Sequence, residues 1–305
     1  YRFLFTANRW YLPPRTRYQS YNIIFRPLLD MLKYLFLILS LVSYLQADSI
    51  SITAVTYNIR NDNKNDKGAL NWDDRKNKIT DYLLKKNASI IGLQEVKHNQ
   101  LEDVVKLLPD HRYVGVGRDD GKTRGEYSPI FYNVKIWKPD PDGQGTFWLS
   151  NTPEIVASRT WGNWHNRICS WVRLIHINSG KAVYVYNTHW DHKSQNAREK
   201  SAELILNKIR SSKHKNEPFL LMGDFNATTS NKAIKTLLAS PTLNDPGVKQ
   251  FSTYSRWQAS LVSGLRIDHL FISNHWNNSS VIVESNGDPA ASDHHPVILK
   301  AILPN

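Results

Sequence analysis

The sequence predicts an α/β protein in which strands and helices alternate along one domain. From residue 50 onward, apolar residues recur with the period of a strand or of one helix face, and no Pro- or Ser-rich linker interrupts them. Hydrophobic residues make up 41% of the 305 residues, enough for a sizeable core, and the charged share of 22% is ordinary. These observations favour strand-rich sheets with outer helices, and they exclude a disordered chain or a repeat array.

The first part of this domain is predicted to run strand, helix, strand, helix. Residues 50–57 alternate apolar and polar side chains, which is typical of a strand, and residues 88–93 form a short apolar strand. Residues 73–86 carry apolar side chains at the spacing of one helix face. The helical pattern of 99–108 stops at Pro109, which cannot continue a helix.

The second part repeats this alternation. Residues 168–177 and 182–188 read as two strands joined by a polar turn that contains Gly180. A long helix is predicted over 194–210, and a shorter one over 230–238, opened by a Ser/Asn cap. The remaining predicted strands are residues 219–222, 266–272, 281–284 and 296–302. The pattern does not predict the order of strands in a sheet.

The N-terminal segment is predicted to lie outside the fold. Residues 31–47 contain the positive Lys33 and then an apolar run over 34–45, which is the pattern of a signal peptide. That run is shorter than the roughly 20 residues that span a bilayer, although an uncleaved anchor is the alternative. We expect residues 1–30 to be an extension outside any domain, residues 48–305 to form one domain, and the protein to be secreted or periplasmic.

The charge and the single cysteine narrow the possible functions. Residues 1–47 hold six Lys or Arg and one Asp, which leaves +7 of the formal net charge of +12 on the predicted domain. A basic domain suits an anionic substrate, although a solvated basic surface explains the charge equally well. The only cysteine, Cys169, lies in an apolar run, so we expect a buried thiol and no intrachain disulfide.

Polar residues cluster directly after the apolar strands. In α/β folds, ligands gather at one set of strand ends, where loops from several strands converge. Each cluster alone has an ordinary explanation as a turn or a solvated loop, but together they predict one site. The residues concerned are Asn58, Glu95, His189, Asp224, Asn226, Asp268, Asp293 and His294.

These residue types suit metal-assisted hydrolysis of a phosphate ester. Mg²⁺ takes oxygen ligands, and Mn²⁺ is an alternative. The oxygen donors predicted to bind it are Asn58, Glu95, Asp224 and Asp293.

Two histidines complete the predicted chemistry. A phosphate ester needs a base for the attacking water and donors for the developing negative charge, and His189 and His294 suit these roles. A catalytic histidine usually needs a carboxylate behind it to set its tautomer, and Asp268 and Glu126 are available.

The ordered motifs resemble those of the endonuclease/exonuclease/phosphatase superfamily, which includes pancreatic-type deoxyribonuclease and neutral sphingomyelinase. The resemblance spans about residues 50–302 and is nearest to secreted bacterial members. The motifs are Tyr57-Asn58, Leu93-Gln94-Glu95, Asn187-Thr188-His189, Gly223-Asp224-Phe225-Asn226, Ile267-Asp268-His269 and Ser292-Asp293-His294-His295-Pro296.

The resemblance implies both a fold and roles for individual residues. The fold is a four-layer α/β sandwich, with two mostly antiparallel sheets packed face to face and helices outside. Asn58, Glu95, Asp224 and Asp293 would bind metal, and Asn226 would hold water or phosphate. His294 paired with Asp268, and His189 backed by Glu126, would act as base or as phosphate donors; the choice between them stays open.

We therefore expect a Mg²⁺-dependent hydrolase of a phosphodiester or phosphomonoester, acting as a monomer without an obligate protein partner. Its substrate is a small molecule, a lipid head group or a nucleic acid. A secreted nuclease is the main alternative, although no stripe of Lys and Arg interleaved with aromatic residues supports it. A catalytically inactive binding module is disfavoured because no carboxylate or histidine of the set is missing. Residues 137–171 are rich in tryptophan, and within them Arg159 and Arg167 are either phosphate ligands or solvated side chains.

Overall fold

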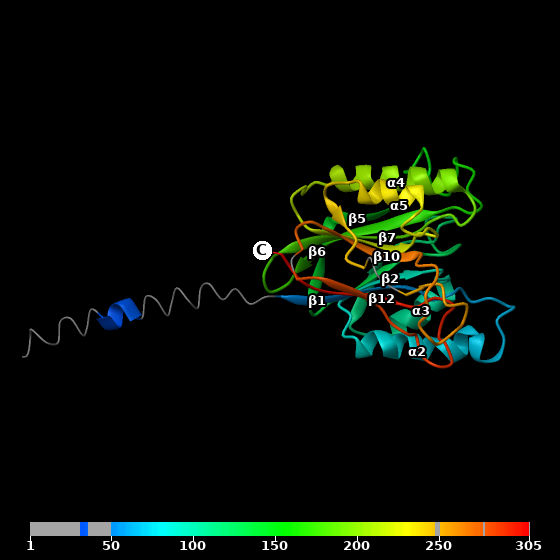
Figure 1. The fold of residues 1–305 in the computed structure, drawn as a ribbon, viewed down its shortest axis with the longest axis horizontal. Coiled ribbons are helices and arrows are strands. Elements are labelled where there is room, and N and C mark those ends of the chain that lie inside the picture. Colours follow the sequence, from blue (N-terminus) through cyan, green and yellow to red (C-terminus); the bar gives the residue numbers. More distant parts are fainter. Residues whose placement is uncertain (1–30, 36–49, 248–250, 277, 305) are drawn as a thin grey trace, which may run out of the picture. The chain divides into compact units, whose positions relative to one another are not determined.

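The fold was obtained as a computed structural model (Figure 1), which describes residues 31–35, 50–247, 251–276 and 278–304. The chain divides into two units, residues 1–49 and 50–305. In the first unit residues 31–35 are helical, and the rest of the predicted signal peptide lies outside the described residues. Among the described helices, none has the length and apolar character needed to cross a membrane.

The second unit is built on two six-stranded sheets. The first sheet has the order β11 (Ser280–Val283), β12 (Val297–Ile302), β1 (Ser51–Asn58), β2 (Ile90–Gln94), β4 (Ile130–Asn133), β3 (His111–Val114). The second has the order β5 (Trp137–Trp148), β6 (Ile168–His176), β7 (Ala182–His189), β8 (Phe219–Asp224), β10 (Asp268–Ser273), β9 (Leu243–Asn244). Each sheet has one parallel pair, β1 with β2 and β7 with β8, and its other neighbours are antiparallel.

Helices cover the outer face of each sheet and complete four layers (Figure 1). The first sheet is covered by α2 (Trp72–Lys85) and α3 (His98–Leu107), and the second by α4 (Gln195–Arg210) and α5 (Lys232–Leu238). A short 3-10 helix, η1 (Gly68–Leu70), precedes α2. The four-layer α/β sandwich with mostly antiparallel sheets is therefore confirmed.

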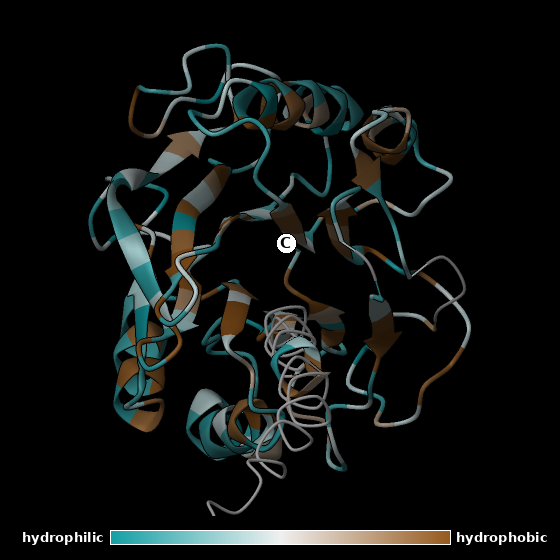
Figure 2. Ribbon diagram, turned by 90° about the vertical axis from the view of Figure 1, so that its left-hand side faces the viewer, coloured by the Kyte–Doolittle hydropathy of each residue, from teal (hydrophilic) through white to brown (hydrophobic). Residues whose placement is uncertain are grey.

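Three buried clusters correspond to the three interfaces between layers. One lies between the sheets and includes Ala54 and Met222. Another packs α4 and α5 on the second sheet, with Ile205 and Phe271, and the third packs α2 and α3 on the first sheet, with Ile79. Hydrophobic colour accordingly appears on most of the strands, while much of the outer loops is hydrophilic (Figure 2). Burial of this apolar surface is the main favourable term in folding.

Polar side chains cap the N-termini of three helices. The Asn71 side chain accepts a hydrogen bond from the Asp74 amide, and Ser194 accepts one from Ala197. Asn231 caps α5 by accepting from the Ala233 amide, which confirms the predicted Ser/Asn cap. Each cap satisfies a backbone N–H that has no partner inside the helix.

Four strands of the structure were not predicted from the sequence, whereas the burial of Cys169 was predicted. The patterns did not indicate β3, β4, β5 or β9. Of these, β5 contains two prolines and two glycines, and its register against β6 shifts between Pro139 and Gln144, so it lacks regular alternation. Cys169 is completely buried on β6, as expected.

A buried polar contact joins the inner faces of the two sheets. Gln94 at the end of β2 donates to Asn187 Oδ1 of β7 at 2.7 Å and to Thr56 Oγ1 at 3.0 Å. Asn187 in turn donates to the carbonyls of Leu93 and Pro129, both at 2.8 Å. The sheets approach closely here, because a Cβ on Gly92 would lie 2.9 Å from the Asn187 side chain. These bonds fix the ends of β2 and β7 relative to each other.

We expect Asn187→Ala to lower the free energy of unfolding by about 2–4 kcal/mol, because it removes three buried hydrogen bonds, those with Gln94 and with the carbonyls of Leu93 and Pro129. Urea unfolding followed by circular dichroism measures this loss. Asn207→Ala, at an exposed position on α4, is the matched control and should change stability by less than about 0.5 kcal/mol. Equal stability of the two variants would contradict a structural role for the contact between the sheets.

Candidate active site

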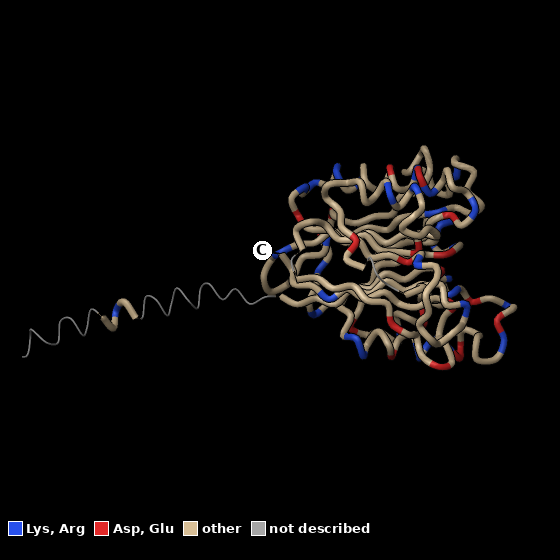
Figure 3. The backbone as a smooth tube through the Cα atoms, viewed as in Figure 1, with Lys and Arg blue, Asp and Glu red and all other residues tan. Residues whose placement is uncertain are grey.

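The parallel pair in each sheet brings two polar strand ends to the same edge. In the first sheet Asn58 lies opposite Gln94, so Asn58 and Glu95 emerge together. In the second sheet His189 lies opposite Asp224. Because the sheets pack face to face, these two strand ends lie close to each other. In Figure 3 acidic and basic positions occur together at the right-hand end of the sheets.

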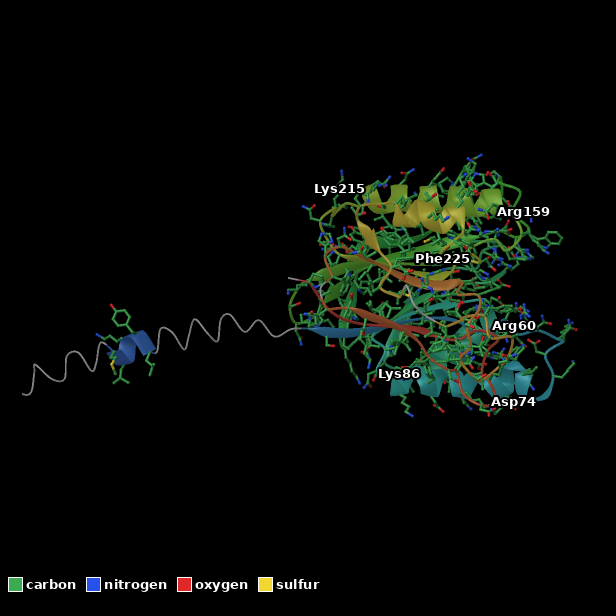
Figure 4. All side chains as sticks on the ribbon, in the orientation of Figure 1. Arg60, Asp74, Lys86, Arg159, Lys215 and Phe225 are labelled. Atoms are coloured by element: carbon green, nitrogen blue, oxygen red, sulfur yellow. The ribbon has the colours of Figure 1, made fainter. Side chains whose placement is uncertain are left out.

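A cleft of about 520 Å³ opens at this edge. Arg60, which lines it, lies at the right-hand end of the sheets in Figure 4. The predicted site residues that line the cleft are Glu95, Glu126, His189, Asp224, Asn226, Asp293 and His294. The other two, Asn58 and Asp268, are completely buried behind these side chains and bonded to them. All nine predicted residues therefore converge.

Asn58 connects the two halves of the site. Its Nδ2 donates to Glu95 Oε1 at 3.1 Å and to Asp224 Oδ2 at 3.0 Å, so one amide bridges both sheets. Its Oδ1 accepts from the Arg60 amide at 3.0 Å. In this structure Asn58 therefore presents its nitrogen to the carboxylates, and its role as a metal ligand stays a prediction.

The predicted pair of Asp268 and His294 is present. Asp268, the first residue of β10, accepts from His294 Nδ1 at 2.8 Å, which leaves Nε2 3.9 Å from Asp224 Oδ2. Burial acts to lower the pKa of His294, but the charge of Asp268 and its hydrogen bond outweigh burial and raise this pKa well above the ordinary value. This shift of the pKa favours the imidazolium form of His294.

The predicted support of His189 by Glu126 is absent. Glu126 instead accepts from Arg118 Nη1 at 2.5 Å and from Asn61 Nδ2 at 3.3 Å. His189 Nε2 lies 3.6 Å from Asp224 Oδ2, and its Nδ1 is buried with no hydrogen-bond partner in the described part of the chain. Burial, followed by the charges of Arg167 and Arg118, holds the pKa of His189 well below the ordinary value. The two histidines thus differ in charge.

The carboxyl groups are crowded and buried in a way that suits a divalent cation. Burial, with the charge of Asp268, raises the pKa of Asp224 to about 7. Burial also raises the pKa of Asp293. Asp224, Asp268 and His294 offer donor atoms that all lie within 4.8 Å of one another, and Asp268 Oδ1 is buried with no hydrogen-bond partner among the described residues. A cation held by Asp224 with Glu95 and Asp293, which line the same cleft, would offset this crowding, and oxygen donors of this kind fit Mg²⁺ or Mn²⁺.

Backbone strain occurs at two site residues. Glu95 has φ 62° and Asn226 has φ 47°, in the left-handed region that non-glycine residues rarely occupy. The Asn226 amide donates to Asp224 Oδ1 at 2.9 Å, and its side chain donates to the Trp190 carbonyl at 3.0 Å. These bonds hold Asn226 and the Asp224 carboxylate in fixed positions at the cleft.

The sequence patterns did not single out several residues of the cleft. Arg118, His165 and His192 line it, and they come from loops, where no periodicity marks a side chain as inward-facing. The sequence did not decide whether Arg159 and Arg167 bind phosphate or are solvated, and the structure distinguishes the two. Arg167 is buried and lines the cleft, whereas Arg159 is exposed and donates to the Trp164 carbonyl.

A second cavity, of about 250 Å³, lies on the outer face of the second sheet. Trp171, Tyr184 and Lys208 are among its lining residues, and it contains none of the predicted site residues. The predicted chemistry therefore belongs to the larger cleft. Of the other tryptophans of this region, Trp148 and Trp161 are buried, and Trp164 is 61% exposed.

A four-layer sandwich with buried carboxylates and two histidines at its strand ends is the arrangement of a hydrolytic enzyme. Residues 55–294 match the family model described as the Endonuclease/Exonuclease/phosphatase family, and this chain belongs to that family. The family resemblance inferred from the sequence is thus confirmed.

The chain is also similar to solved structures, one of which carries the same family description. The chain is 31% identical, with a TM-score of 0.78, to the endonuclease/exonuclease/phosphatase from Bacteroides vulgatus, over 83% of this chain and 99% of that one. It is also 31% identical to a Bacteroides thetaiotaomicron mannosyl-6-phosphatase, with a TM-score of 0.75 over 83% and 100% of the two chains.

A more distant relative is the Saccharomyces cerevisiae CCR4-Not complex 3'-5'-exoribonuclease subunit Ccr4, which is 24% identical over 56% of this chain. The match spans only 24% of that relative's length. The chain thus covers about a quarter of the length of the curated relatives that it matches.

Gly223 is required for the pairing that places His189 beside Asp224. It has φ +152°, and an added Cβ would lie 2.0 Å from the Thr188 carbonyl oxygen. We expect Gly223→Ala to lower the free energy of unfolding by about 2 kcal/mol more than Gly180→Ala. Gly180 also has a positive φ, of +71°, but its Cβ would meet nothing within 4 Å. If denaturant unfolding gave the two variants equal losses of stability, the close approach of Gly223 to Thr188 would not require a glycine.

Proposed function

We propose that this protein hydrolyses a phosphate ester with the help of a divalent metal ion. The observation that carries the proposal is the convergence of Asn58, Glu95 and His294, from the strand ends and the loop before β12 of one sheet, with His189, Asp224 and Asp268 from the other. Carboxylates, a neutral histidine and an imidazolium within one cleft supply metal ligands, a proton acceptor and a donor to phosphate.

Glu95, Asp224 and Asp293 are the carboxylates proposed to hold the metal. All three line the cleft, and oxygen ligands of this kind suit Mg²⁺ or Mn²⁺. When bound, such an ion polarises a phosphoryl oxygen and lowers the pKa of a coordinated water. Asn58 keeps Glu95 and Asp224 together across the two sheets through its bonds to both.

The two histidines take different parts in the proposed reaction. Asp268 holds His294 Nδ1, so the imidazolium directs its Nε2 proton toward the cleft, where it binds a phosphate oxygen. His189 is neutral, and its Nε2 lies near Asp224 Oδ2, so this pair can take up or deliver a proton at the ester oxygens. Asn226, at the cleft, offers a further polar contact to water or phosphate.

The relatives support phosphate-ester hydrolysis but differ in substrate. One is named as a mannosyl-6-phosphatase and another as an exoribonuclease subunit. The match to the exoribonuclease keeps a nuclease as the second candidate. A panel of 4-nitrophenyl phosphate, bis(4-nitrophenyl) phosphate, sugar phosphates, sphingomyelin, RNA and plasmid DNA separates the two candidates.

We expect metal removal to abolish turnover on every substrate of that panel. Incubation with EDTA followed by gel filtration should lower the rate at least about 10³-fold, since the cation is required to stabilise charge in the transition state. Added Mg²⁺ or Mn²⁺ should restore it, while circular dichroism stays unchanged. Full activity of a protein shown to be metal-free by elemental analysis would contradict the proposal.

His294 and Asp268 are expected to act as one unit. His294→Ala should lower kcat at least about 10²-fold. Asp268→Asn should lower kcat by a comparable factor, because the carboxylate orients the ring and stabilises its charge. The double variant should lose no more than the worse single variant. His275→Ala, at an exposed position beyond the far end of β10, is the control and should keep normal kcat. Additive losses would mean that the two side chains work independently.

A further inference from the structure

Arg167 lies beside the reacting histidine in the cleft. It directly precedes β6, and the antiparallel register of Cys169 with Thr188 brings it next to the end of β7, where His189 stands. Only 3% of Arg167 is exposed, yet it lines the main cleft. Arg118, Glu126 and His189 pack around the same narrow gap as Arg167, which is too small to admit a water molecule.

The guanidinium of Arg167 lacks the hydrogen bonds that its burial demands. Its Nε and Nη1 are buried with no partner among the residues that the structure describes. The third nitrogen, Nη2, lies 3.4 Å from His192 Nδ1, a long contact. A buried charged group without hydrogen bonds costs several kcal/mol, so this arrangement needs an explanation.

The neighbouring carboxylates do not supply these bonds. Asp191 Oδ2 is 3.9 Å from Arg167 Nε, beyond hydrogen-bond range. The Asp191 oxygens accept instead from four backbone amides, those of Trp164, His165, Lys193 and Ser194. Glu126 is engaged by Arg118 and Asn61. The carboxylates thus balance part of the charge of Arg167 and leave its N–H groups unpaired.

Arg75, a buried arginine with a structural role in the same fold, differs from Arg167 in its hydrogen bonds. Arg75 of α2 is completely buried and donates to four backbone carbonyls, those of Ile59, Arg60, Leu70 and Ala291. These bonds join α2 to the loops after β1 and before β12. Arg167 makes no such set of bonds, so packing alone does not account for it.

Further cationic or donor groups stand on the same side of the cleft. Arg118 is 8% exposed, lines the cleft, and its Nε is also buried without a partner within the described ranges. His165 and His192 stack on each other with ring centroids 5.9 Å apart, and both line the cleft. Two arginines with unpaired nitrogens and two histidines therefore line the cleft together with His189.

We propose that Arg167 binds two free oxygens of a terminal phosphate group, so that the substrate class is a phosphomonoester dianion. This rests on the proposed hydrolytic function. A monoester carries about two negative charges and three free oxygens, whereas a diester carries one charge and two free oxygens, with a second ester group in the third position. The planar guanidinium fork suits bidentate binding of phosphate.

The reaction balances as simple hydrolysis. Water adds to phosphorus, the bond from phosphorus to the ester oxygen breaks, and a proton reaches the departing oxygen. The products are an alcohol and inorganic phosphate, and Arg167 holds the free phosphate oxygens throughout. No oxidant, reductant or second substrate is needed.

The test compares 4-nitrophenyl phosphate with bis(4-nitrophenyl) phosphate, which share a leaving group, in saturating Mg²⁺. We expect the wild-type protein to favour the monoester. Arg167→Met should lower kcat/KM for the monoester about 10²-fold, the usual effect of removing one donor to a developing anion, and should lower the ratio of monoester to diester at least tenfold. Arg167→Lys should retain only part of the wild-type kcat/KM for the monoester, because an ammonium lacks the planar pair of N–H donors of a guanidinium. The inhibition constant of inorganic phosphate should rise in parallel.

Two controls separate this role from a structural one. Arg159→Met, at an exposed position of the same region, should leave the monoester-to-diester ratio unchanged. Arg167→Met should keep or raise the melting temperature, since it removes a buried charge that lacks partners, whereas Arg75→Met should lower it. A lower melting temperature for Arg167→Met would assign Arg167 to the structure and overturn the inference.

The remaining outcomes distinguish the inference from the function on which it rests. A wild-type protein that prefers the diester, or an Arg167→Met variant that loses both activities equally, would overturn the inference and leave phosphate-ester hydrolysis intact. A wild-type protein that hydrolyses neither ester nor any substrate of the wider panel, with Mg²⁺ or Mn²⁺ present, would overturn the proposed function itself.

Discussion

The buried contact between Gln94 and Asn187 is the constraint on which the rest of the site depends. The two amides, at the ends of β2 and β7, bond to each other and to the carbonyls around them. A layer of apolar side chains alone would allow the sheets to slide or rotate, because hydrophobic contact is not directional. Hydrogen bonds between specific amides permit one arrangement, in which the ends of both parallel pairs face each other across the cleft.

This arrangement explains why neither sheet contains a complete site. Asn58 and Glu95 come from the first sheet, and His189 and Asp224 come from the second. The amide of Asn58 crosses the boundary to reach both carboxylates. The outer helices contribute stability through the two outer cores, but they contribute no side chain to the cleft lining. Function in this fold therefore depends on how accurately two sheets are aligned.

The sequence predicted the fold class and the membership of the site better than the contacts within it. Apolar strands followed by polar residues identified the strand ends, and the resemblance supplied the layers. The twelve-residue β5 was missed, because its Pro139 to Gly143 stretch breaks the alternation. Glu126 was correctly placed at the cleft but was assigned the wrong partner. It bonds to Arg118, whose inward position depends on a loop conformation that residue patterns do not encode.

Buried polar groups without hydrogen bonds distinguish the residues proposed to act on a ligand from the residues that stabilise this fold. Arg75 donates to four backbone carbonyls of the protein, and its removal would take one donor from each of them. Asp268 Oδ1, His189 Nδ1 and two nitrogens of Arg167 have no partner within the described residues. Each of these atoms destabilises the free protein, since a buried polar group without a hydrogen bond costs about 1–3 kcal/mol. The three cores tolerate that cost, and binding of the proposed cation and phosphate together would offset it. Unpaired groups of both signs in one cleft thus support the proposal of a ligand pair that carries both signs.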